Sequence, residues 1–433
     1  MTVSIARPAI DQWPDLAEVP RGLRTTVSAA VARRIFRAGV ERLPVTVHLG
    51  DETLGTGGPA MTIHRPEEFF ARLGRGVLIG FGEAYLTGAW DAPDLGAFLS
   101  VLAADMPTLV PQSLQRLRSL AVLRPPHHQR STTANSQNNI AHHYDLSNEL
   151  FELFLDPGLS YSAALFEAER VHDDGFGRAT APVPGSDLAE GQWRKIGRLL
   201  DHTDVRSGSR VLEIGTGWGE LAISAARRGA LVHSITLSTE QKALAERRIA
   251  DAGLSDRISV ELLDYRDLVG PGSPHLGAYD AVLSVEMIEA VGFDFWDEYF
   301  STLDAVLAPG GAVGIQAITM RHDRMLATRN TYTWINKYIF PGGLLPSVEV
   351  IDQITRERTT LRVTDRLSFG RHYAETLRQW DQRFLANRER VIGLGFDETF
   401  VRMWHFYLEY SLAGFASDYI DVNQIVMRRE PGA

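Results

Sequence analysis

A glycine-rich turn near the middle of the chain is the most specific chemical signal in the sequence. The segment VLEIGTGWGELA places Gly215 and Gly217 directly after an apolar strand pattern, and a helical pattern follows. Glycine at such positions lets the backbone turn tightly and approach a ligand closely. Glu213 lies just before the turn, where a carboxylate would attract the cationic end of a ligand.

Residue 220 separates two classes of ligand that bind at such turns. Dinucleotide-binding enzymes use Gly or Ala there, because the pyrophosphate comes to the start of the helix. This chain has Glu220, whose negative charge would repel a pyrophosphate. An acidic rim suits a nucleoside that carries a sulfonium group better.

Two further strand ends carry polar residues that would line the same crevice, since ligands of α/β sheets bind at the carboxyl ends of the strands. Thr236 and Leu237 end one strand pattern, and Gln241 follows one turn later. Asp264 and Tyr265 end the next, where we expect Asp264 to bind an adenine amine and Tyr265 to stack on the ring. The alternative is that all these residues serve only in turns and caps.

The elements that must position these residues alternate between strand and helix patterns. The strand patterns are RVLEIG, LVHSITLS, ISVELLD, AYDAVLSVEM and AVGIQAIT, and helical stretches such as TEQKALAERRIADAG separate them. This rhythm predicts an α/β fold with a mostly parallel sheet and helices on both faces. LRVTDRLSF and YIDVNQIVMRR are expected to supply the last strands.

The chain divides at a segment rich in Pro, Ser, Thr and Asn. Residues 124–139 lack apolar periodicity and are typical of a linker. Residues 1–123 predict a smaller N-terminal α+β domain with strands such as VTVHLG and AMTIH, and residues 140–433 form the main domain. We expect the N-terminal domain to contact lipid or membrane, or to dimerise.

Composition excludes several classes of protein and site. The chain of 433 residues has a net charge of −10, and its acidic surplus lies after residue 134, which argues against nucleic acid as a partner. It has no Cys, so disulfides and thiolate metal sites are excluded. His142 and His143 lack further ligands at suitable spacing, so no metal site is expected. With no signal peptide and no apolar run of about 20 residues, we expect a cytoplasmic protein.

A basic amphipathic segment lies near the N-terminus. Its arginines are Arg21, Arg24, Arg33, Arg34, Arg37 and Arg42, and its apolar positions include Val27, Val31 and Ile35. Such a segment suits peripheral contact with the anionic inner face of a membrane. The alternative is a helix docked on its own domain with a solvated arginine face.

Several separate motifs, in order, resemble the cyclopropane-fatty-acyl-phospholipid synthase family. They include HHYDLSNELFELFLD, LSYSAALF, VLEIGTGWGELA, SVEMIEAVG, KYIFPGGLLPS and FGRHYAETLRQW. The resemblance implies a Rossmann-like class I methyltransferase domain that uses S-adenosylmethionine to alkylate the double bond of an unsaturated acyl chain on a phospholipid. It places Tyr161 and Ser162 with the cofactor residues named above, and it makes Glu289 and Tyr373 active-site residues.

Three positions depart from the pattern of the family, whose members hold a bicarbonate ion as base. The motif Cys is Ala163, a Gly is Glu286 and a His is Gln316. These changes remove bicarbonate ligands and add a negative charge, so bicarbonate is doubtful. The motifs SVEMIEAVG, QAITM and FPGGLLPS look closer to the actinobacterial branch that makes 10-methylene precursors of 10-methylstearic (tuberculostearic) acid.

The departures suggest a different proton acceptor. If residues 286–289 are helical, Glu286 and Glu289 share a face, and their repulsion raises the pKa of one of them. Gln316 would orient that carboxylate by a hydrogen bond. The alternative is that Glu286 faces solvent or binds the ribose of the cofactor.

Rival functions remain open at this stage. One is a cyclopropane synthase on the same substrate, another a methyltransferase of small molecules, and a third a non-catalytic lipid-binding protein. The sequence also leaves open a reductase partner that would act on the methylene product, and a homodimer.

Overall fold

The computed structural model describes residues 8–9, 11–105, 147–173 and 176–429, and these form two compact units. Unit 1 comprises residues 1–125, 331–339 and 384–419, and unit 2 comprises 126–330, 340–383 and 420–433. Two later stretches, which the sequence placed in the domain of 140–433, therefore cluster with the N-terminal residues. The expected linker at 124–139 lies outside the described residues, as do His142 and His143.

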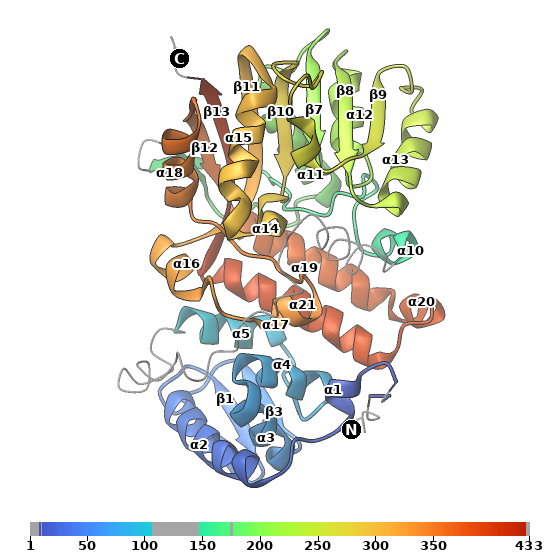
Figure 1. The fold of residues 1–433 in the computed structure, drawn as a ribbon. Helices are drawn as coiled ribbons and strands as arrows, with labels where there is room; N and C mark the ends of the chain where they lie inside the picture. The colour runs from blue at the N-terminus through green and yellow to red at the C-terminus, as the bar shows by residue number, and fades with distance from the viewer. Residues whose placement is uncertain (1–7, 10, 106–146, 174–175, 430–433) are drawn as a thin grey trace. The chain divides into compact units, whose positions relative to one another are not determined.

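Unit 2 is built on a nine-stranded sheet (Figure 1). From one edge to the other its strands are β5 (Arg170–Asp173), β6 (Phe176–Ala179), β12 (Leu361–Ser368), β13 (Ile420–Arg429), β11 (Leu307–Met320), β10 (Tyr279–Val285), β7 (Arg210–Ile214), β8 (Leu231–Thr236) and β9 (Ile258–Leu262). The five strands from β11 to β9 are parallel, whereas β13 runs antiparallel to both β11 and β12. The predicted mostly parallel sheet, with its last two strands from the C-terminal part of the chain, is confirmed.

Alternate side chains of the central strands pack on opposite faces, as the two-residue period of a strand requires. On β10, Val282 packs on one face and Leu283 on the other. Helices α15 (Trp296–Val306) and α18 (Val348–Arg358) cover the first face, and α11 (Leu188–His202), α12 (Glu220–Arg227) and α13 (Thr239–Asp251) cover the second. The sheet is thus buried on both sides, and only strand ends are free to build a site.

The remaining helices of unit 2 are short, apart from one. They are α10 (Asn148–Glu152), η2 (Tyr265–Leu268), α14 (Ile288–Val291), η3 (Phe293–Phe295) and α16 (His322–Thr328), together with the longer α19 (Gly370–Ala386), whose last residues belong to unit 1. The N-cap of α13 is Ser238, whose hydroxyl accepts from the amide of Gln241 at 3.2 Å. This cap fixes where the helix begins after β8.

Unit 1 contains a four-stranded sheet in the order β2 (Glu52–Leu54), β1 (Thr46–Leu49), β3 (Ala60–Ile63) and β4 (Trp90–Asp91). The predicted strands VTVHLG and AMTIH correspond to β1 and β3. Its helices are α1 (Pro14–Ala17), α2 (Leu23–Val40), α3 (Pro66–Gly76), α4 (Leu78–Leu86), α5 (Leu95–Ala104), α17 (Trp334–Tyr338), α20 (Arg388–Gly393) and α21 (Glu398–Ala416). Within the part of the chain that the structure describes, no helix is long and apolar enough to cross a membrane.

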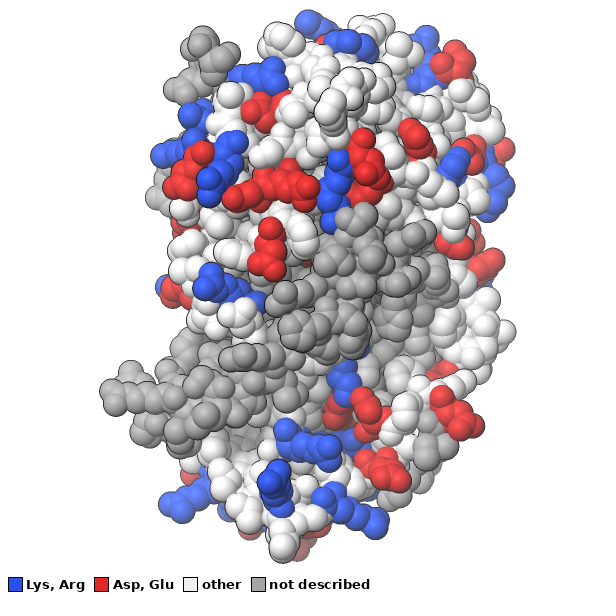
Figure 2. All heavy atoms as spheres, in the orientation of Figure 1, with Lys and Arg blue, Asp and Glu red and all other residues white. Residues whose placement is uncertain are grey.

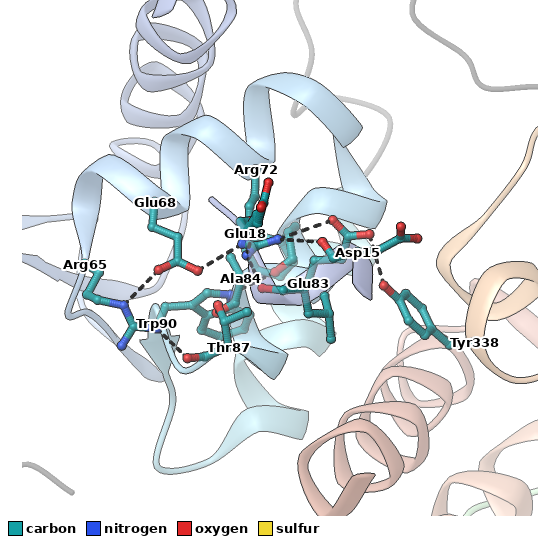
Figure 3. A network of polar contacts seen from close by, with 12 residues as sticks. Asp15, Glu18, Arg65, Glu68, Arg72, Glu83, Ala84, Thr87, Trp90 and Tyr338 are labelled. Carbon is teal, nitrogen blue, oxygen red and sulfur yellow. Dashed lines mark hydrogen bonds and ion pairs between the residues drawn. The ribbon is translucent and has the colours of Figure 1, made fainter. Parts of the chain in front are cut away.

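A buried network of charged side chains ties the segments of unit 1 together (Figure 3). Arg72 is 1% exposed, and its guanidinium donates to Glu68 at 3.0 Å and to the carbonyl of Leu16 at 2.7 Å. Glu83 accepts hydrogen bonds from Lys337 at 2.6 Å and from the hydroxyl of Tyr338 at 3.0 Å. These bonds hold α17 against α4, which explains why residues 331–339 belong to unit 1.

Candidate active site

The glycine turn joins β7 to α12 and forms the floor of a cavity. Gly215 has φ +97° and Gly217 has φ +53°, conformations that residues with a Cβ adopt only at a cost. Thr216 lies between them, and its hydroxyl bonds that of Ser234 on β8 at 2.7 Å. The turn therefore presents bare backbone to the cavity, as a close-fitting ligand requires.

All ten residues predicted to contact the cofactor line this one cavity of about 190 Å³. They are Tyr161, Ser162, Glu213, Gly215, Gly217, Thr236, Leu237, Gln241, Asp264 and Tyr265. They come from the ends of β7, β8 and β9, from the first turn of α13 and from the segment before β5, which the fold brings to the same edge of the sheet. Glu286 and Met287, after the end of β10, and Ala290 and Val291, on α14, line the same cavity.

Glu213 is buried at the end of β7, and within the described part of the chain it forms no ion pair. Its carboxylate accepts a hydrogen bond of 2.5 Å from the hydroxyl of Ser234. Burial raises the pKa of Glu213 to about 8, and the bond from Ser234 opposes that rise. A cationic ligand in the cavity would stabilise the ionised form of this group.

Asp264 and Tyr265 differ in part from the expected nucleoside contacts. Both oxygens of Asp264 accept from the guanidinium of Arg266, at 2.8 and 2.6 Å. The ring of Tyr265 packs edge-on against Tyr299, with 5.3 Å between the ring centroids. Arg266 thus already satisfies much of the hydrogen-bonding capacity of the carboxylate that we expected to bind adenine.

Helix α11 holds the segment that carries Tyr161 and Ser162. Gln192 donates to the carbonyl of Ser162 at 2.8 Å, and the ammonium of Lys195 donates to its hydroxyl at 2.6 Å. Burial lowers the pKa of Lys195 to about 8, although the nearby Glu286 opposes this. The ring of Tyr161 stacks on Trp380 with 5.2 Å between centroids. Gln192 and Lys195 were missed in the sequence analysis. Their signal was that, together with Arg198, they are polar residues among the buried apolar positions of a helix.

Glu286 has a strained backbone and a fully engaged carboxylate. Its φ is +50°, which costs a residue with a side chain on the order of 1–2 kcal/mol. Its Oε1 accepts from the amide of Ala163 at 2.9 Å and from Gln316 at 2.8 Å. Its Oε2 accepts from the hydroxyl of Tyr373 at 2.6 Å. Burial raises the pKa of Glu286, while these three hydrogen bonds and Lys195 lower it.

Glu289 lies beside Glu286, but not for the reason that the sequence suggested. The expectation of a shared helical face is wrong, because α14 begins at Ile288 and Glu286 precedes it with a positive φ. Strand β11 brings the two together instead, since Gln316 holds Glu286 and the amide of Ile318 donates to Glu289 at 2.5 Å.

The second oxygen of Glu289, Oε2, is buried and has no hydrogen-bond partner among the described residues. Burial and the charge of Glu286 raise the pKa of Glu289 to about 8. The site therefore combines one carboxylate saturated with donors and one with a free buried oxygen. Gln316 orients Glu286, as expected, and the solvent-facing alternative for Glu286 does not apply.

Comparison with known proteins agrees with this geometry. The model of the mycolic acid cyclopropane synthetase family matches residues 131–425. The chain belongs to this family. It is 50% identical to the tuberculostearic acid methyltransferase UfaA1 of Mycobacterium tuberculosis, over 97% of this chain and 96% of that protein. It is 31% identical to the cyclopropane-fatty-acyl-phospholipid synthase of Escherichia coli, over 88% of this chain and 93% of that protein.

A solved structure of the family contains a cofactor product. The mycolic acid cyclopropane synthase CmaA1 complexed with SAH and CTAB is 27% identical, with a TM-score of 0.57 over 70% of this chain and 99% of that chain. The predictions of family, of fold class and of an S-adenosylmethionine-dependent enzyme that methylates unsaturated fatty acyl chains are thereby confirmed.

The two small molecules that the resemblance implied fit this site differently. The glycine turn and the uncompensated Glu213 fit a cationic nucleoside, so the cavity suits S-adenosylmethionine. Bicarbonate does not fit, because the carboxylate of Glu286 already takes the hydrogen bonds of Ala163, Gln316 and Tyr373. A second anion there would meet two carboxylates and no free donor from these three groups.

Proposed function

We propose that this enzyme converts an oleoyl chain of a phospholipid to a 10-methylene acyl chain, using Glu286 as its own proton acceptor. The observation that carries the proposal is the carboxylate of Glu286, which three donors hold at the wall of the cofactor cavity. The similarity over nearly the whole chain to a protein named tuberculostearic acid methyltransferase supports the product.

S-adenosylmethionine, when bound, supplies an electrophilic methyl group on a positively charged sulfur. The chain's own residues must hold the alkene in line with that methyl and exclude water. Such positioning contributes on the order of 7–11 kcal/mol to lowering a barrier. We assign Tyr161, Ser162 and the glycine turn to holding the cofactor.

The reaction that follows takes place on the acyl chain. The π electrons of the double bond form the new C–C bond to the methyl carbon, and the C–S electrons return to sulfur. One chain carbon becomes cationic, and a hydride shift from the methylated carbon moves the charge there. Loss of a proton from the new methyl group then gives the exocyclic methylene, whereas loss of that proton without a hydride shift would close a cyclopropane.

Glu286 is placed to take that proton. The hydroxyl of Tyr373 and the amide of Gln316 keep the carboxylate facing the cavity wall, and Lys195 adds a nearby positive charge. Glu289 has a buried unpaired oxygen, and its ionised form is suited to stabilise the cationic chain carbon by charge. A cationic carbon nearby would in turn lower the raised pKa of Glu289 and favour that ionised form. Proton abstraction by a positioned general base, the role proposed for Glu286, typically contributes about 10²- to 10⁴-fold to a rate.

Product analysis tests this function. The purified enzyme is incubated with oleoyl phospholipid and S-adenosylmethionine, and the product acids are treated with ozone before mass spectrometry. A methylene and a ring have the same mass, but ozone cleaves only the alkene. Cleavage at carbon 10 is expected, and an ozone-resistant product would instead support a cyclopropane synthase, the second candidate that the similarity to the Escherichia coli enzyme favours.

We further propose that α2 brings the enzyme to an anionic membrane surface. Leu23, Val27 and Val31 recur at four-residue spacing along one side of this helix and are 88%, 65% and 53% exposed. The helix has four arginines and no acidic residue, and Figure 2 shows Lys and Arg side chains over the part of unit 1 where it lies, beside some acidic ones. An apolar stripe with arginines beside it suits an interface of anionic lipids. A reductase partner and a homodimer remain predictions.

A further inference from the structure

A series of hydrogen bonds leads from β12 and β13, next to β11 in the sheet, to Glu286. Gln316 on β11 and Gln424 on β13 are direct partners across two antiparallel strands. Gln424 donates its side-chain amide to the oxygen of Gln316 at 3.2 Å, and Gln316 donates its own amide to Glu286 at 2.8 Å. Both amide side chains are buried, with exposures of 0% and 1%.

The direction of this series of hydrogen bonds is fixed at the end away from Glu286. Arg198 on α11 donates to the side-chain oxygen of Gln424 at 3.1 Å, and it is itself held by Asp365 on β12 at 2.5 Å. A guanidinium has donors only, so Gln424 must turn its oxygen toward Arg198 and its NH₂ group away. That NH₂ group also donates to the carbonyl of Lys195 at 2.9 Å, an acceptor that allows no other orientation.

The orientation of Gln424 determines which group Gln316 presents to Glu286. With the NH₂ group of Gln424 facing it, Gln316 must present its oxygen to Gln424 and its own NH₂ group to Glu286. If Gln316 were reversed, its oxygen would face an oxygen of Glu286, and the ionised form of that carboxylate would be destabilised.

We propose that Gln424 is a positioning residue, which acts through Gln316 to keep Glu286 supplied with a donor and ready to accept a proton. This inference rests on the proposed function of Glu286. We call the series Asp365, Arg198, Gln424 and Gln316 the relay to Glu286. Arg198 and Asp365 hold its first part in place, and neither lines the cavity.

Other titratable groups lie around Glu286. Tyr373 on α19, Lys195 on α11 and Glu289 after β10 all interact with it, and the amide of Ala163 donates to it. These groups are the same in the wild-type chain and in a variant at Gln424. The shift between the two pH profiles, rather than the position of either, therefore reports on the relay.

The test is the variant Gln424→Glu, which can accept from Arg198 but offers Gln316 no donor in its ionised form. Its kcat/KM is measured as a function of pH by release of S-adenosylhomocysteine, which does not depend on whether the product is a methylene or a ring. We expect the acidic limb of the profile of kcat/KM against pH to move to higher pH by about one unit, which lowers kcat/KM tenfold below the midpoint. The reason is that the carboxylate of Glu286 loses the hydrogen bond from Gln316. Binding of S-adenosylmethionine in calorimetry should be unchanged.

Asn423→Asp is the matched control, since it also turns a buried amide on β13 into an acid. Asn423 donates to Thr319 at 3.0 Å and takes no part in the relay. This variant should lose stability but keep the acidic limb of the wild type. An acidic limb that does not move in Gln424→Glu, or that moves equally in Asn423→Asp, would overturn the proposal.

A second variant covers the case in which Gln424→Glu does not fold. Gln424→Met has a similar volume and no polar group, so Gln316 loses the donor to its oxygen and keeps only the carbonyl of Ala163, at 3.3 Å, and Glu286 as acceptors for its NH₂ group. A smaller upward shift of the acidic limb is expected, and a folded Gln424→Met with an unshifted limb would contradict the relay. If the wild type makes a cyclopropane, the proposed product fails, but the comparison of limbs still decides the role of Gln424.

Discussion

The hydroxyl of Tyr373 donates to Oε2 of Glu286 across 2.6 Å, which joins helix α19 to the end of β10. The other oxygen of Glu286 takes its hydrogen bonds from Ala163 and Gln316. The carboxylate is therefore fixed by three separate parts of unit 2 at the edge of the cavity beside the glycine turn. Its strained backbone is consistent with a functional role, because such residues concentrate at active sites.

Removing the donor from Tyr373 should weaken catalysis without unfolding the protein. In Tyr373→Phe, Glu286 loses a charge-assisted hydrogen bond, which contributes about 1.5–3 kcal/mol. We expect kcat to fall roughly 10- to 100-fold and the acidic limb of the pH profile to move to higher pH. Steady-state kinetics at several pH values measure both, and a kcat equal to that of the wild type would argue against the assignment. Tyr419→Phe, at the end of unit 1, is a suitable control.

Neutralising Glu286 should have a larger effect. Glu286→Gln keeps the size of the side chain but cannot accept a proton, so kcat should fall about 100-fold or more. The affinity for S-adenosylmethionine, measured by calorimetry, should change little. Full turnover by this variant would exclude Glu286 as the proton acceptor.

Stabilisation by the cofactor should depend on pH through Glu213. The folded-state pKa of about 8 lies above the unfolded value, so this group stabilises the free enzyme fully below about pH 4 and loses that contribution as pH rises through 8. Bound S-adenosylmethionine favours the ionised carboxylate, so the rise in Tm that it causes should increase from pH 6 to pH 9. Glu213→Gln should flatten this dependence, and identical profiles for the two proteins would contradict the role.

The network of Figure 3 predicts a large loss of stability when one partner is removed. Arg72→Met removes one of the two arginines that hold Glu68, and Arg65 at 2.9 Å remains. It also leaves the carbonyl of Leu16 without its donor, so the loss should be about 1–3 kcal/mol. Urea unfolding followed by circular dichroism measures the change. Arg75→Met on the same helix, at an exposed position, should cost far less, and equal effects of the two would contradict this role of Arg72.

Membrane contact through α2 predicts a specific loss of vesicle binding. The double variant Val27→Glu, Val31→Glu places two charges on the exposed stripe, and co-sedimentation with vesicles containing anionic lipid should fall at least tenfold. Leu394→Glu changes another exposed apolar residue of unit 1 and serves as the control. Turnover of a detergent-dispersed substrate should remain in the double variant. Retained vesicle binding would assign membrane contact to another surface.

The sequence predicted those parts of the site that local chain geometry determines. Glycines after a strand need no distant partner to form a turn, so Gly215 and Gly217 were found from residue type and spacing. Strand ends of a parallel sheet meet at one edge, which is why Thr236 and Tyr265 reach the same cavity. The motif resemblance added Tyr161, Tyr373 and Glu289.

The remainder depends on contacts between residues far apart in the chain. Gln424 meets Gln316 only because β13 pairs with β11 in one register, and a one-residue slip would move it to the other face of the sheet. The shared face of Glu286 and Glu289 was conditional on a helix over 286–289, but Glu286 precedes α14 with a positive φ. Its carboxylate is held by distant parts of the chain, at Ala163, Gln316 and Tyr373. The assignment of α17 to unit 1 likewise depends on Glu83, more than 250 residues away from Lys337 in the sequence.

The most direct test of the built-in proton acceptor is the response to bicarbonate in carbon-dioxide-free buffer, followed by release of S-adenosylhomocysteine. The wild type should turn over at the same rate with and without added bicarbonate, because Glu286 takes the hydrogen bonds that the anion would need. The kcat of Glu286→Gly should fall about 100-fold or more, and activity should return when bicarbonate or formate is supplied. A wild-type rate that rises with bicarbonate, or a Glu286→Gly variant with full activity and the same product, would contradict the account.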